Sequence, residues 1–550
     1  MTSTTRLVLG PVLRHVGPTD ATIWVETDGP CTVEVLGHRE PTWCVGSHHF
    51  ALVCIGGLEP GTSTPYDVRL DGEQVWPVPE NPQPPSRIRT LDPAGPVRLV
   101  FGSCRYATPG AVDDDKRFSA DALDAYAQRM ARLPEDRWPD ALLLLGDQVY
   151  ADETSPRTRE RIAAKRDITV PPEEQVADFE EYTWLYQESW ADPQVRWLLS
   201  TLPSSMIFDD HDIRDDWNTS HEWRLRMQAT AWWEDRIAGG LSSYWVYQHL
   251  GNLSPDALAD DELYQRVRGH DGDAEPLLRE FALAADREAD GGKGAQWSYR
   301  RDLCGVRLLV IDSRCGRMLA DGQRTMVSER EFRWIEDQVA GDYDHLLVGT
   351  SLPWLLPRAL HDVESWNERL AAGSRGPRMA RLAERMRCAA DLEHWAAFRD
   401  SFDRLAHLFA CVGRGDHAGS GGQPPATVCV LSGDVHHAYA AAVHYDGSVR
   451  SKVYQLTCSP VHNYVPRVMQ VAFRVAWSRV AERVTRFLLD RISRVPPLEL
   501  DWTRLCGPMF GNQIATLTLD GRSAALLIER GGTDRRNRPE LTPSASVPLT

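Results

Sequence analysis

The sequence predicts an α/β protein that carries a small all-β domain in front of it. Residues 7–90 alternate apolar and polar side chains and contain many turn signals, as the strands of a sandwich do. From Pro96 onward, short apolar strands alternate with amphipathic helical stretches, which is typical of layered α/β folds. Polar clusters directly follow six of these strands, at the position where ligands collect in open α/β sheets.

Residues 1–90 are predicted to form a β-sandwich of fibronectin or immunoglobulin type. Ala21–Glu26 follows the two-residue period of a strand, and Asp71-Gly72 marks a hairpin turn between two short runs. The proline-rich stretch Pro79–Pro85 is typical of a linker. We therefore divide the chain into this sandwich, a larger domain over residues 91–530, and a polar, proline-rich tail over residues 531–550 that we expect to be disordered.

The composition is that of an acidic protein with ample material for packed cores. The 550 residues carry 61 basic and 78 acidic side chains, a formal net charge of −17, so we expect no nucleic-acid-binding surface. No uncharged apolar run reaches the about 18 residues of a spanning helix, and no export signal is recognised. The eleven cysteines are scattered without a CxxC motif, which indicates reduced thiols and a cytoplasmic location.

The larger domain is expected to gather chemistry-bearing side chains at the ends of its strands. The predicted strands cover residues 97–101, 141–145, 205–208, 306–311, 345–348 and 426–431. The residues that follow them are Cys104, Asp147 with Tyr150, Asp209-Asp210-His211-Asp212, Asp312 with Arg314, Thr350-Ser351, and Asp434 with His436. A thiol, a phenol, carboxylates and imidazoles at one sheet edge suit metal ions better than a nucleophilic triad.

Cys104, Asp147 and Tyr150 are candidate ligands of one metal ion. Asp147 and Tyr150 lie three residues apart in a loop, so both can face one point. A phenol has an ordinary pKa of about 10, so tyrosine ligates well only to a strong Lewis acid, which favours Fe3+ over Zn2+ or Mg2+. A thiolate suits a soft or borderline metal. The competing interpretations are a hydrogen-bonded phenol for Tyr150, and a core thiol or a catalytic nucleophile for Cys104, although no glycine-rich phosphate loop follows that cysteine.

Asp209-Asp210-His211-Asp212 directly follows an apolar run, and charges buried there without a cation would be strongly destabilising. Asp210 is the candidate bridging ligand and Asp209 a further metal ligand. His211 is the candidate general acid that protonates a leaving oxygen, and we expect Asp209 or Asp212 to orient it. The competing interpretation is a helix N-terminus rich in carboxylates.

Asp434 and His436 are predicted to lie on one face of an extended turn as metal ligands, with His437 pointing away in a structural role. Two interpretations of Arg314 remain open. Its guanidinium is free to bind an anion with two hydrogen bonds in the first, and it forms a structural salt bridge in the second.

Residues 467–494 predict a long, basic, amphipathic helix. Its apolar residues follow a three-to-four spacing, and seven arginines stand against Glu482 and Asp490. We prefer a helix whose apolar face packs over the acidic catalytic domain. A helix that lies on a membrane surface fits the same pattern.

Taken together, these motifs resemble the calcineurin-like metallophosphoesterases, and within them the alkaline phosphatase D (PhoD-type) family. The residues that carry the resemblance are Gly102-Ser103-Cys104, Gly146–Tyr150, Asp209–Asp212, Asp312-Ser313-Arg314 and Ser432–His436. The resemblance covers roughly residues 7–530, and all five motifs in this order are strongly specific. It implies a four-layer α/β/β/α metallophosphoesterase sandwich, hydrolysis of phosphate mono- or diesters, and an iron–calcium centre held at Cys104, Asp147, Tyr150, Asp434 and His436.

The chain departs from the family's pattern in three respects. Family members are typically exported, whereas no signal is recognised here. Asp215-Asp216 stand where family members often carry asparagine, and Thr350-Ser351 stand where general metallophosphoesterases place a metal-binding histidine. A second metal site without that histidine is rich in oxygen ligands and so suits Ca2+, with Zn2+ and Mn2+ as alternatives.

We therefore expect metal-dependent hydrolysis of a small phosphate-ester substrate. Hydroxide generated by the metals would attack phosphorus in line, and His211 would protonate the departing oxygen. The alternative is a non-catalytic metal-binding or scaffold protein derived from such an enzyme. A third interpretation is metal-dependent acyl hydrolysis at the same centre.

Overall fold

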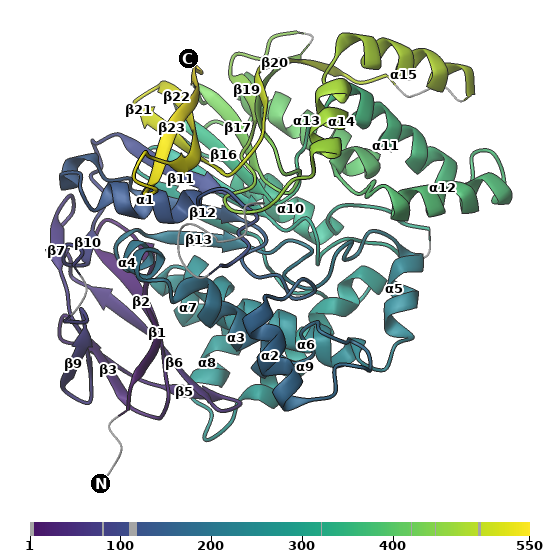
Figure 1. Cartoon of the computed structure of the whole chain (residues 1–550). Helices are drawn as coiled ribbons and strands as arrows, with labels where there is room; N and C mark the ends of the chain where they lie inside the picture. The colour runs from purple at the N-terminus through teal and green to yellow at the C-terminus, as the bar shows by residue number, and fades with distance from the viewer. Residues whose placement is uncertain are drawn as a thin grey trace.

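The computed structural model describes residues 5–79, 82–108, 118–320, 322–419, 421–445, 447–492 and 497–550 (Figure 1). Its first part is an all-β domain of two four-stranded antiparallel sheets and a short strand pair. The strands of the first sheet are β1 (Leu7–Val16), β2 (Asp20–Thr27), β6 (His48–Gly56) and β5 (Trp43–Val45), those of the second are β4 (His38–Pro41), β3 (Thr32–Val35), β8 (Val68–Leu70) and β9 (Glu73–Trp76), and the pair is β7 (Ser63–Pro65) with β10 (Arg87–Arg89).

The two four-stranded sheets share one apolar core, which confirms the predicted β domain in front of the larger one. Ile23 and Val53 of the first sheet belong to the same buried cluster as Val33 and Val68 of the second. Each of these strands places alternate side chains inward, so the two-residue period of the sequence becomes a face of the sandwich.

The larger domain contains two further sheets. The six-stranded sheet has the order β13 (Ser204–Ile207), β12 (Ala141–Leu145), β11 (Val97–Gly102), β21 (Gln513–Asp520), β22 (Ser523–Thr533), β23 (Pro539–Pro548). The seven-stranded sheet has the order β14 (Tyr299–Leu303), β15 (Val306–Ile311), β16 (His345–Thr350), β17 (Thr427–Ser432), β19 (Lys452–Thr457), β18 (Ala438–Tyr445), β20 (Leu500–Met509). All six strands predicted from apolar runs are present.

These sheets are the two middle layers of an α/β/β/α sandwich, as predicted. The two sheets pack directly against each other at Gly349 of β16. A Cβ added to this residue would lie only 3.2 Å from Cδ2 of Leu145 in the other sheet. The outer layers include α1 (Ala122–Met130), which contacts the six-stranded sheet, and α10 (Glu329–Gln338) with α13 (Arg399–Arg414), which contact the seven-stranded sheet. The strands between them are apolar on both faces because both faces are covered.

Further helices surround this sandwich, several of them between its lower edge and the β domain (Figure 1). The α-helices are α2 (Pro156–Lys165), α3 (Phe179–Trp190), α4 (Pro193–Thr201), α5 (His221–Gln228), α6 (Trp233–Tyr244), α7 (Pro255–Asp260), α8 (Glu262–Arg268), α9 (Glu275–Asp286), α11 (Arg358–Ala371), α12 (Pro377–Ala389), α14 (Arg467–Ala476) and α15 (Arg479–Ile492). Short helical turns are η1 (Glu135–Arg137), η2 (Trp245–His249), η3 (Leu250–Asn252), η4 (Arg287–Asp290) and η5 (Trp395–Ala397).

The C-terminal residues form a strand, so the prediction of a disordered tail over residues 531–550 is wrong. β23 pairs antiparallel with β22 along its whole length. Leu549 is fully buried, and its carbonyl accepts a hydrogen bond of 2.6 Å from the hydroxyl of Tyr454. β23 is an edge strand, and edge strands tolerate prolines because one side of the strand needs no hydrogen-bond donors.

The basic segment forms two helices, α14 and α15, instead of the single helix predicted over residues 467–494, of which 493–494 lie outside the described residues. The helical segment is interrupted at Ser478. The hydroxyl of this residue accepts a hydrogen bond from the amide of Ala481 and so caps the start of α15. The preferred packing of the apolar face over the catalytic domain is not found. α14 has no buried residue, and α15 buries only Leu489.

A partly buried ionic cluster ties the β domain to the helices of the larger domain. His48 of β6 lies between two carboxylates, with Nδ1 2.7 Å from Glu26 Oε1 and Nε2 2.9 Å from Glu180 Oε2 of α3. The hydroxyl of Tyr247 donates to the other oxygen of Glu26 at 3.0 Å. Although burial opposes protonation, the two carboxylates raise the pKa of His48 to about 9.

We expect this cluster to make stability depend on pH. Because the folded-state pKa of His48 is raised, its contribution is complete below the unfolded-state pKa of about 6.5 and is lost as the pH rises through about 9. The difference in melting temperature between the native chain and His48→Gln should therefore decrease as the pH is raised from about 6.5 to about 9. The exposed His444→Gln serves as the control. A difference that stays constant over this range would contradict the assignment.

Candidate active site

The predicted site residues lie on loops that leave the carboxyl ends of strands in both large sheets. Cys104 follows β11, Asp147 follows β12, Asp209 and Asp210 follow β13, and Asp434 follows β17. β11, β12 and β13 run parallel, as do β15, β16, β17 and β19, so the ends of each set meet at one edge. The two edges face each other, since Cys104 Sγ lies 3.9 Å from the carbonyl oxygen of Asp434.

The loops turn sharply and approach each other closely. Four side chains of the site sit on backbone in the left-handed region, which non-glycine residues rarely adopt; they are Cys104, Asp147, Asp434 and His436. Two glycines permit the close approach. A Cβ at Gly146 would lie 2.4 Å from Asp209 Cβ, and one at Gly433 would lie 2.0 Å from Ser103 Oγ. Larger residues at either position would push the loops apart.

Asp212 holds two of these loops together. Its Oδ2 accepts hydrogen bonds of 2.9 Å from the backbone amides of both Asp147 and Asp209. Its Oδ1 accepts a third, of 3.2 Å, from the side chain of Gln248. A single carboxylate thus fixes the spacing between the loop after β12 and the loop after β13. Asp212 is a structural brace and does not orient His211, contrary to one of the two predicted possibilities.

One end of the site contains the thiol and the phenol. Burial, together with the nearby carboxylates of Asp147 and Asp434, raises the pKa of the Cys104 thiol well above its usual range. Burial likewise raises the pKa of the Tyr150 hydroxyl, which lies 3.5 Å from Asp147 Oδ2 and accepts a hydrogen bond of 2.8 Å from Asn463. Neither group would lose its proton in this environment unless a cation lay beside it.

The other end consists of carboxylates around Arg314. This guanidinium is fully buried and pairs through Nε with Asp209, and through Nη2 with Asp210 at 3.3 Å and Asp434 at 3.4 Å. Its Nη1 lies 2.5 Å from Glu393. Arg314 is therefore not free to bind a substrate anion in this arrangement, and the geometry agrees with the salt-bridge interpretation.

His211 lies at the wall of the site and is oriented by a residue that sequence reasoning missed. Its Nδ1 lies 2.9 Å from Asp152 Oδ1, and its Nε2 lies 3.8 Å from Oδ1 of the exposed Asp215. Although burial opposes both effects, the pair raises the pKa of His211 well above its usual range and lowers that of Asp152 to about 2. Asp209, the other predicted orienting residue, has no contact with His211 and instead binds Arg314.

A second histidine, His394, reaches the site from a loop that no strand pattern marks. Its Nε2 lies 3.0 Å from Asp434 Oδ2, and its Nδ1 lies 2.7 Å from Glu364 Oε1 of α11. Glu393, the residue before it, binds Arg314. His437 lies outside the centre, as predicted, with Nδ1 2.7 Å from the carbonyl of Val435.

The residues present fit metal ions. Each of three groups offers ligand atoms within 4.8 Å of one another: Cys104 with Asp147 and His436, Asp147 with Asp210 and His211, and Asp209 with Asp210 and Asp434. Asp147 Oδ1 and Asp209 Oδ2 are buried and accept no hydrogen bond from the described part of the chain, so each has a lone pair available for a cation. Tyr150 adds its phenol at the thiol end.

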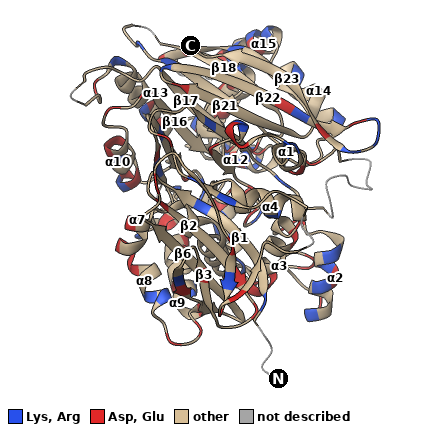
Figure 2. Ribbon diagram, turned by 90° about the vertical axis from the view of Figure 1, so that its left-hand side faces the viewer, with Lys and Arg blue, Asp and Glu red and all other residues tan. Residues whose placement is uncertain are grey.

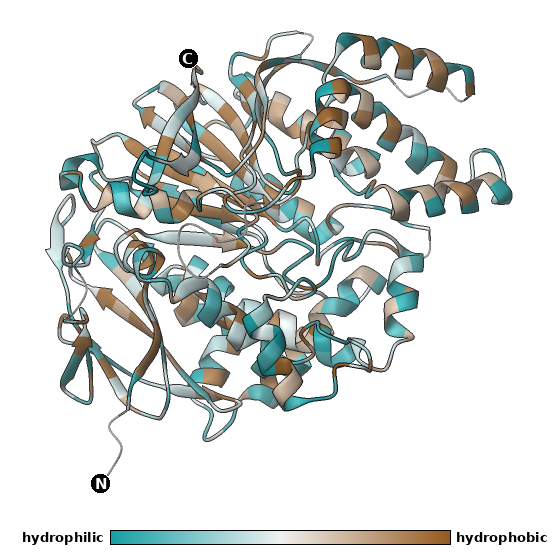
Figure 3. Cartoon of the chain, in the orientation of Figure 1, coloured by the Kyte–Doolittle hydropathy of each residue, from teal (hydrophilic) through white to brown (hydrophobic). Residues whose placement is uncertain are grey.

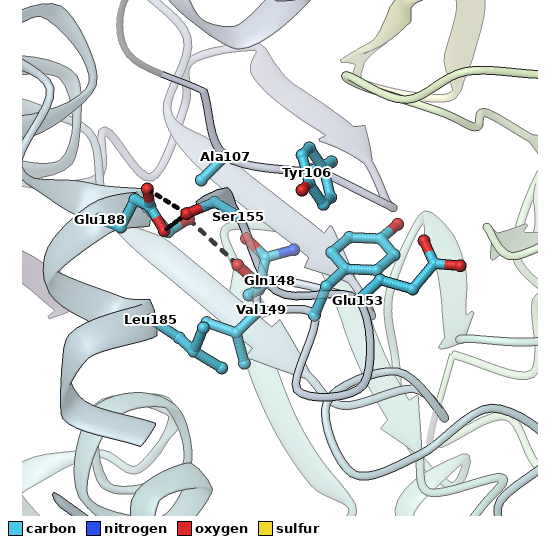
Figure 4. A pocket seen from close by; sticks show the side chains of 10 residues that line it. Tyr106, Ala107, Gln148, Val149, Glu153, Ser155, Leu185 and Glu188 are labelled. Carbon is cyan, nitrogen blue, oxygen red and sulfur yellow. Dashed lines mark hydrogen bonds between the residues drawn. The ribbon is translucent and has the colours of Figure 1, made fainter. Parts of the chain in front are cut away.

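A cleft of about 1160 Å³ gives access to this centre. It is lined by Asp147, Asp210, His211, Asp434 and His436, and by residues of the loop before α14 and of α14 itself. A much smaller pocket of about 20 Å³ is lined in part by Tyr150, and Ser155 donates hydrogen bonds to Glu188 at its wall (Figure 4). The small pocket is a packing gap, and the large cleft has room for a substrate.

Comparisons with known proteins identify two regions of the chain. Residues 116–273 match a family model described as PhoD-like phosphatase, and residues 4–88 match one described as a domain of unknown function (DUF7800). A solved structure titled "Structure of PhoD" is similar, with a TM-score of 0.57 and 11% sequence identity over 100% of this chain and 93% of that chain. That similarity shows the fold. No curated protein sequence matches this chain.

We expect Asp212→Ala to destabilise the protein by about 3 kcal/mol, because two buried backbone amides and Gln248 lose their common acceptor. Unfolding in denaturant should show the loss. The exposed Asp271→Ala removes a carboxylate without this role and should leave stability nearly unchanged. If both variants were equally stable, the loops would be fixed by some other contact.

Proposed function

We propose that this chain, which belongs to the PhoD-type family, hydrolyses phosphate esters in the cleft that contains Asp147, Asp210 and His211. The observation that carries the proposal is the overlap of the three potential ligand groups. Asp147 belongs to the first and second groups, and Asp210 belongs to the second and third. Two shared carboxylates are suited to hold two cations close together, and His211 lies beside both.

The two ends of the centre differ in chemistry, which supports two different metals. Thiolate, phenolate and imidazole ligands at Cys104, Tyr150 and His436 favour Fe3+. The carboxylate end, with Asp209, Asp210 and Asp434, offers only oxygen and favours Ca2+. Asp216 lies close to this end, because its amide donates to Asp210 Oδ2 at 3.1 Å. Zn2+ and Mn2+ are the alternatives.

When bound, such a metal pair supplies Lewis acidity toward phosphate oxygens and lowers the pKa of water at the centre. The protein's own contribution is to hold the parts in place. Asp212 fixes the spacing of the two loops, and Arg314 balances and positions three carboxylates. We assign Arg314 this positioning role in place of direct binding to the substrate.

His211 is proposed to donate the proton that the leaving oxygen needs. Asp152 fixes one ring nitrogen, so the other nitrogen, Nε2, is directed toward the cleft. A histidine held in this way presents its proton at a defined point, which is the geometric requirement of a general acid. The ring also lies within reach of a metal bound by Asp147 and Asp210, so its role needs a direct test.

We further propose that the protein works in a reducing compartment, the cytoplasm. All eleven cysteines are free, and four of them are buried. Among the described residues, no helix is both long and apolar enough to cross a lipid bilayer.

Metal analysis paired with a panel of phosphate mono- and diesters tests the proposed function. The purified protein should contain iron and calcium and show a visible absorption band from phenolate or thiolate bound to Fe3+. Tyr150→Phe should shift or remove that band. Tyr106→Phe changes a neighbouring ring, 5.5 Å away between centroids, and should leave it unchanged. A colourless, iron-free protein with full activity would rule out the ferric site, and metal without turnover of any ester would favour a scaffold role.

The role of His211 is tested through the leaving group. An alkoxide needs a proton to depart, whereas p-nitrophenolate largely does not. His211→Asn should therefore slow hydrolysis of alkyl phosphoesters roughly 10²–10⁴-fold, and that of p-nitrophenyl esters clearly less. Asp152→Asn should show the same pattern with a smaller loss, because the ring loses the carboxylate that orients it and raises its pKa, but the imidazole itself remains.

Two measurements separate a general acid from other roles. Metal content should be unchanged in His211→Asn, and its loss would show that His211 is a ligand. Equal rate losses for both kinds of ester would indicate a positioning role. His221→Asn, on the exposed first turn of α5, controls for loss of a surface imidazole.

A further inference from the structure

Helices α14 and α15 expose an unusual amount of apolar surface. Nine of the fourteen large apolar side chains that are exposed in the described part of the chain belong to these two helices. They are Val468, Met469, Val471, Val475, Val480, Val484, Phe487, Leu488 and Ile492. A soluble surface seldom gathers so many apolar side chains unless the surface meets a partner.

The apolar side chains form one stripe on each helix, with a row of arginines beside it. On α15, Val480, Val484 and Phe487 are spaced by four and three residues, so they share one face. Arg479, Arg483 and Arg486 each directly precede one of these residues. Since neighbouring helical positions differ by about 100°, the cationic row borders the apolar stripe.

The same order holds on α14. Val468, Val471 and Val475 form the stripe. Arg467 directly precedes Val468, and Arg474 directly precedes Val475. Residues 467–492 contain six arginines and two acidic residues, a net charge of 6 − 2 = +4, on a chain whose formal net charge is −17. Figure 3 shows the apolar segments of both helices, and Figure 2 shows their cationic segments.

Other side chains fasten the two helices to the protein and so direct the stripe outward. Phe473 packs against His437 with 4.5 Å between ring centroids and the rings tilted by 34°, and Trp477 donates to His437 Nε2 at 3.3 Å. Arg486 pairs with Asp362 of α11 at 3.2 Å. α15 lies beyond α11 at the periphery of the molecule (Figure 1), and Leu489 is its one buried residue.

The helices also form part of the rim of the cleft. Pro466, Met469 and Phe473 line the same cleft as His211 and Asp434. Any surface that the apolar stripes contact would therefore lie next to the opening through which a substrate enters.

We propose that α14 and α15 dock the protein on an anionic lipid surface. Apolar side chains beside a cationic row are the pattern of helices that lie in a membrane interface, with arginines at the level of the headgroups. An acidic protein is repelled by such a surface, so a local positive charge is needed at the point of contact. A second copy of this chain fits less well, because two surfaces that each carry a net positive charge would face each other. The proposal does not depend on the proposed function.

Vesicle flotation with the full chain tests the proposal. The native protein should bind vesicles of phosphatidylcholine mixed with phosphatidylglycerol, and bind phosphatidylcholine alone clearly less. Added salt should weaken the binding. The double variants Phe487→Ser with Leu488→Ser, and Arg479→Gln with Arg483→Gln, should each lower partitioning by about tenfold or more. All four positions lie outside the residues that line the cleft, so hydrolysis of a soluble ester should be unchanged.

Matched controls change the same chemistry elsewhere. Leu225→Ser removes an apolar side chain that is 54% exposed on α5, and Arg535→Gln with Arg536→Gln removes two exposed arginines. Both should bind vesicles like the native chain. The proposal is overturned if the native chain ignores anionic vesicles, or if the helix variants bind as the controls do. It is also overturned if sedimentation in the absence of lipid shows a dimer that the Phe487 and Leu488 variant abolishes.

Discussion

Negative charge buried where the two large sheets meet is the constraint on which the site depends. Asp209 and Asp210 lie within reach of Asp434, Asp147 lies within reach of Asp210, and Asp209 is fully buried. Such carboxylates are stable only beside compensating positive charge. Arg314 supplies one such charge to three of the four and to Glu393. One guanidinium leaves negative charge uncompensated, so this edge attracts cations, and the loops around it must be held by other means. Asp212 and the close contacts at Gly146 and Gly433 provide that support.

The parts of the structure that follow from local pattern were predictable from the sequence. Each apolar run became a strand because both of its faces are covered, and the polar residues after β11, β12, β13 and β17 met because parallel strands end together. The expectation that site residues follow the carboxyl ends of strands does not identify His394. This residue lies after α12, in a loop that no strand precedes. The position of Asp152, two residues after Tyr150 in the same loop, could have marked it as a site residue. Its contact with His211, however, depends on how two separate loops pack against each other.

Two errors have a common physical origin. Composition predicted that residues 531–550 are disordered, and the preferred interpretation of the spacing in residues 467–494 was that their apolar face packs over the catalytic domain. In the first case, backbone pairing with the neighbouring strand β22 made a polar, proline-rich segment into an edge strand. In the second, the apolar stripe has no protein partner among the described residues. Sequence periodicity shows that a face is apolar, but the partner of that face is set by the tertiary structure, or lies outside the chain.

The order of strands in the six-stranded sheet has a consequence for biosynthesis. β11 pairs with β12 on one side and with β21 on the other, and β21 lies about four hundred residues later in the chain. While the ribosome is still making the middle of the protein, β11 therefore has an unpaired edge beside the loop of Cys104. Such edges recruit other strands, and contacts between distant residues form slowly. The nascent chain thus needs protection at this edge until β21 has been made, and β11 is held on both sides only then.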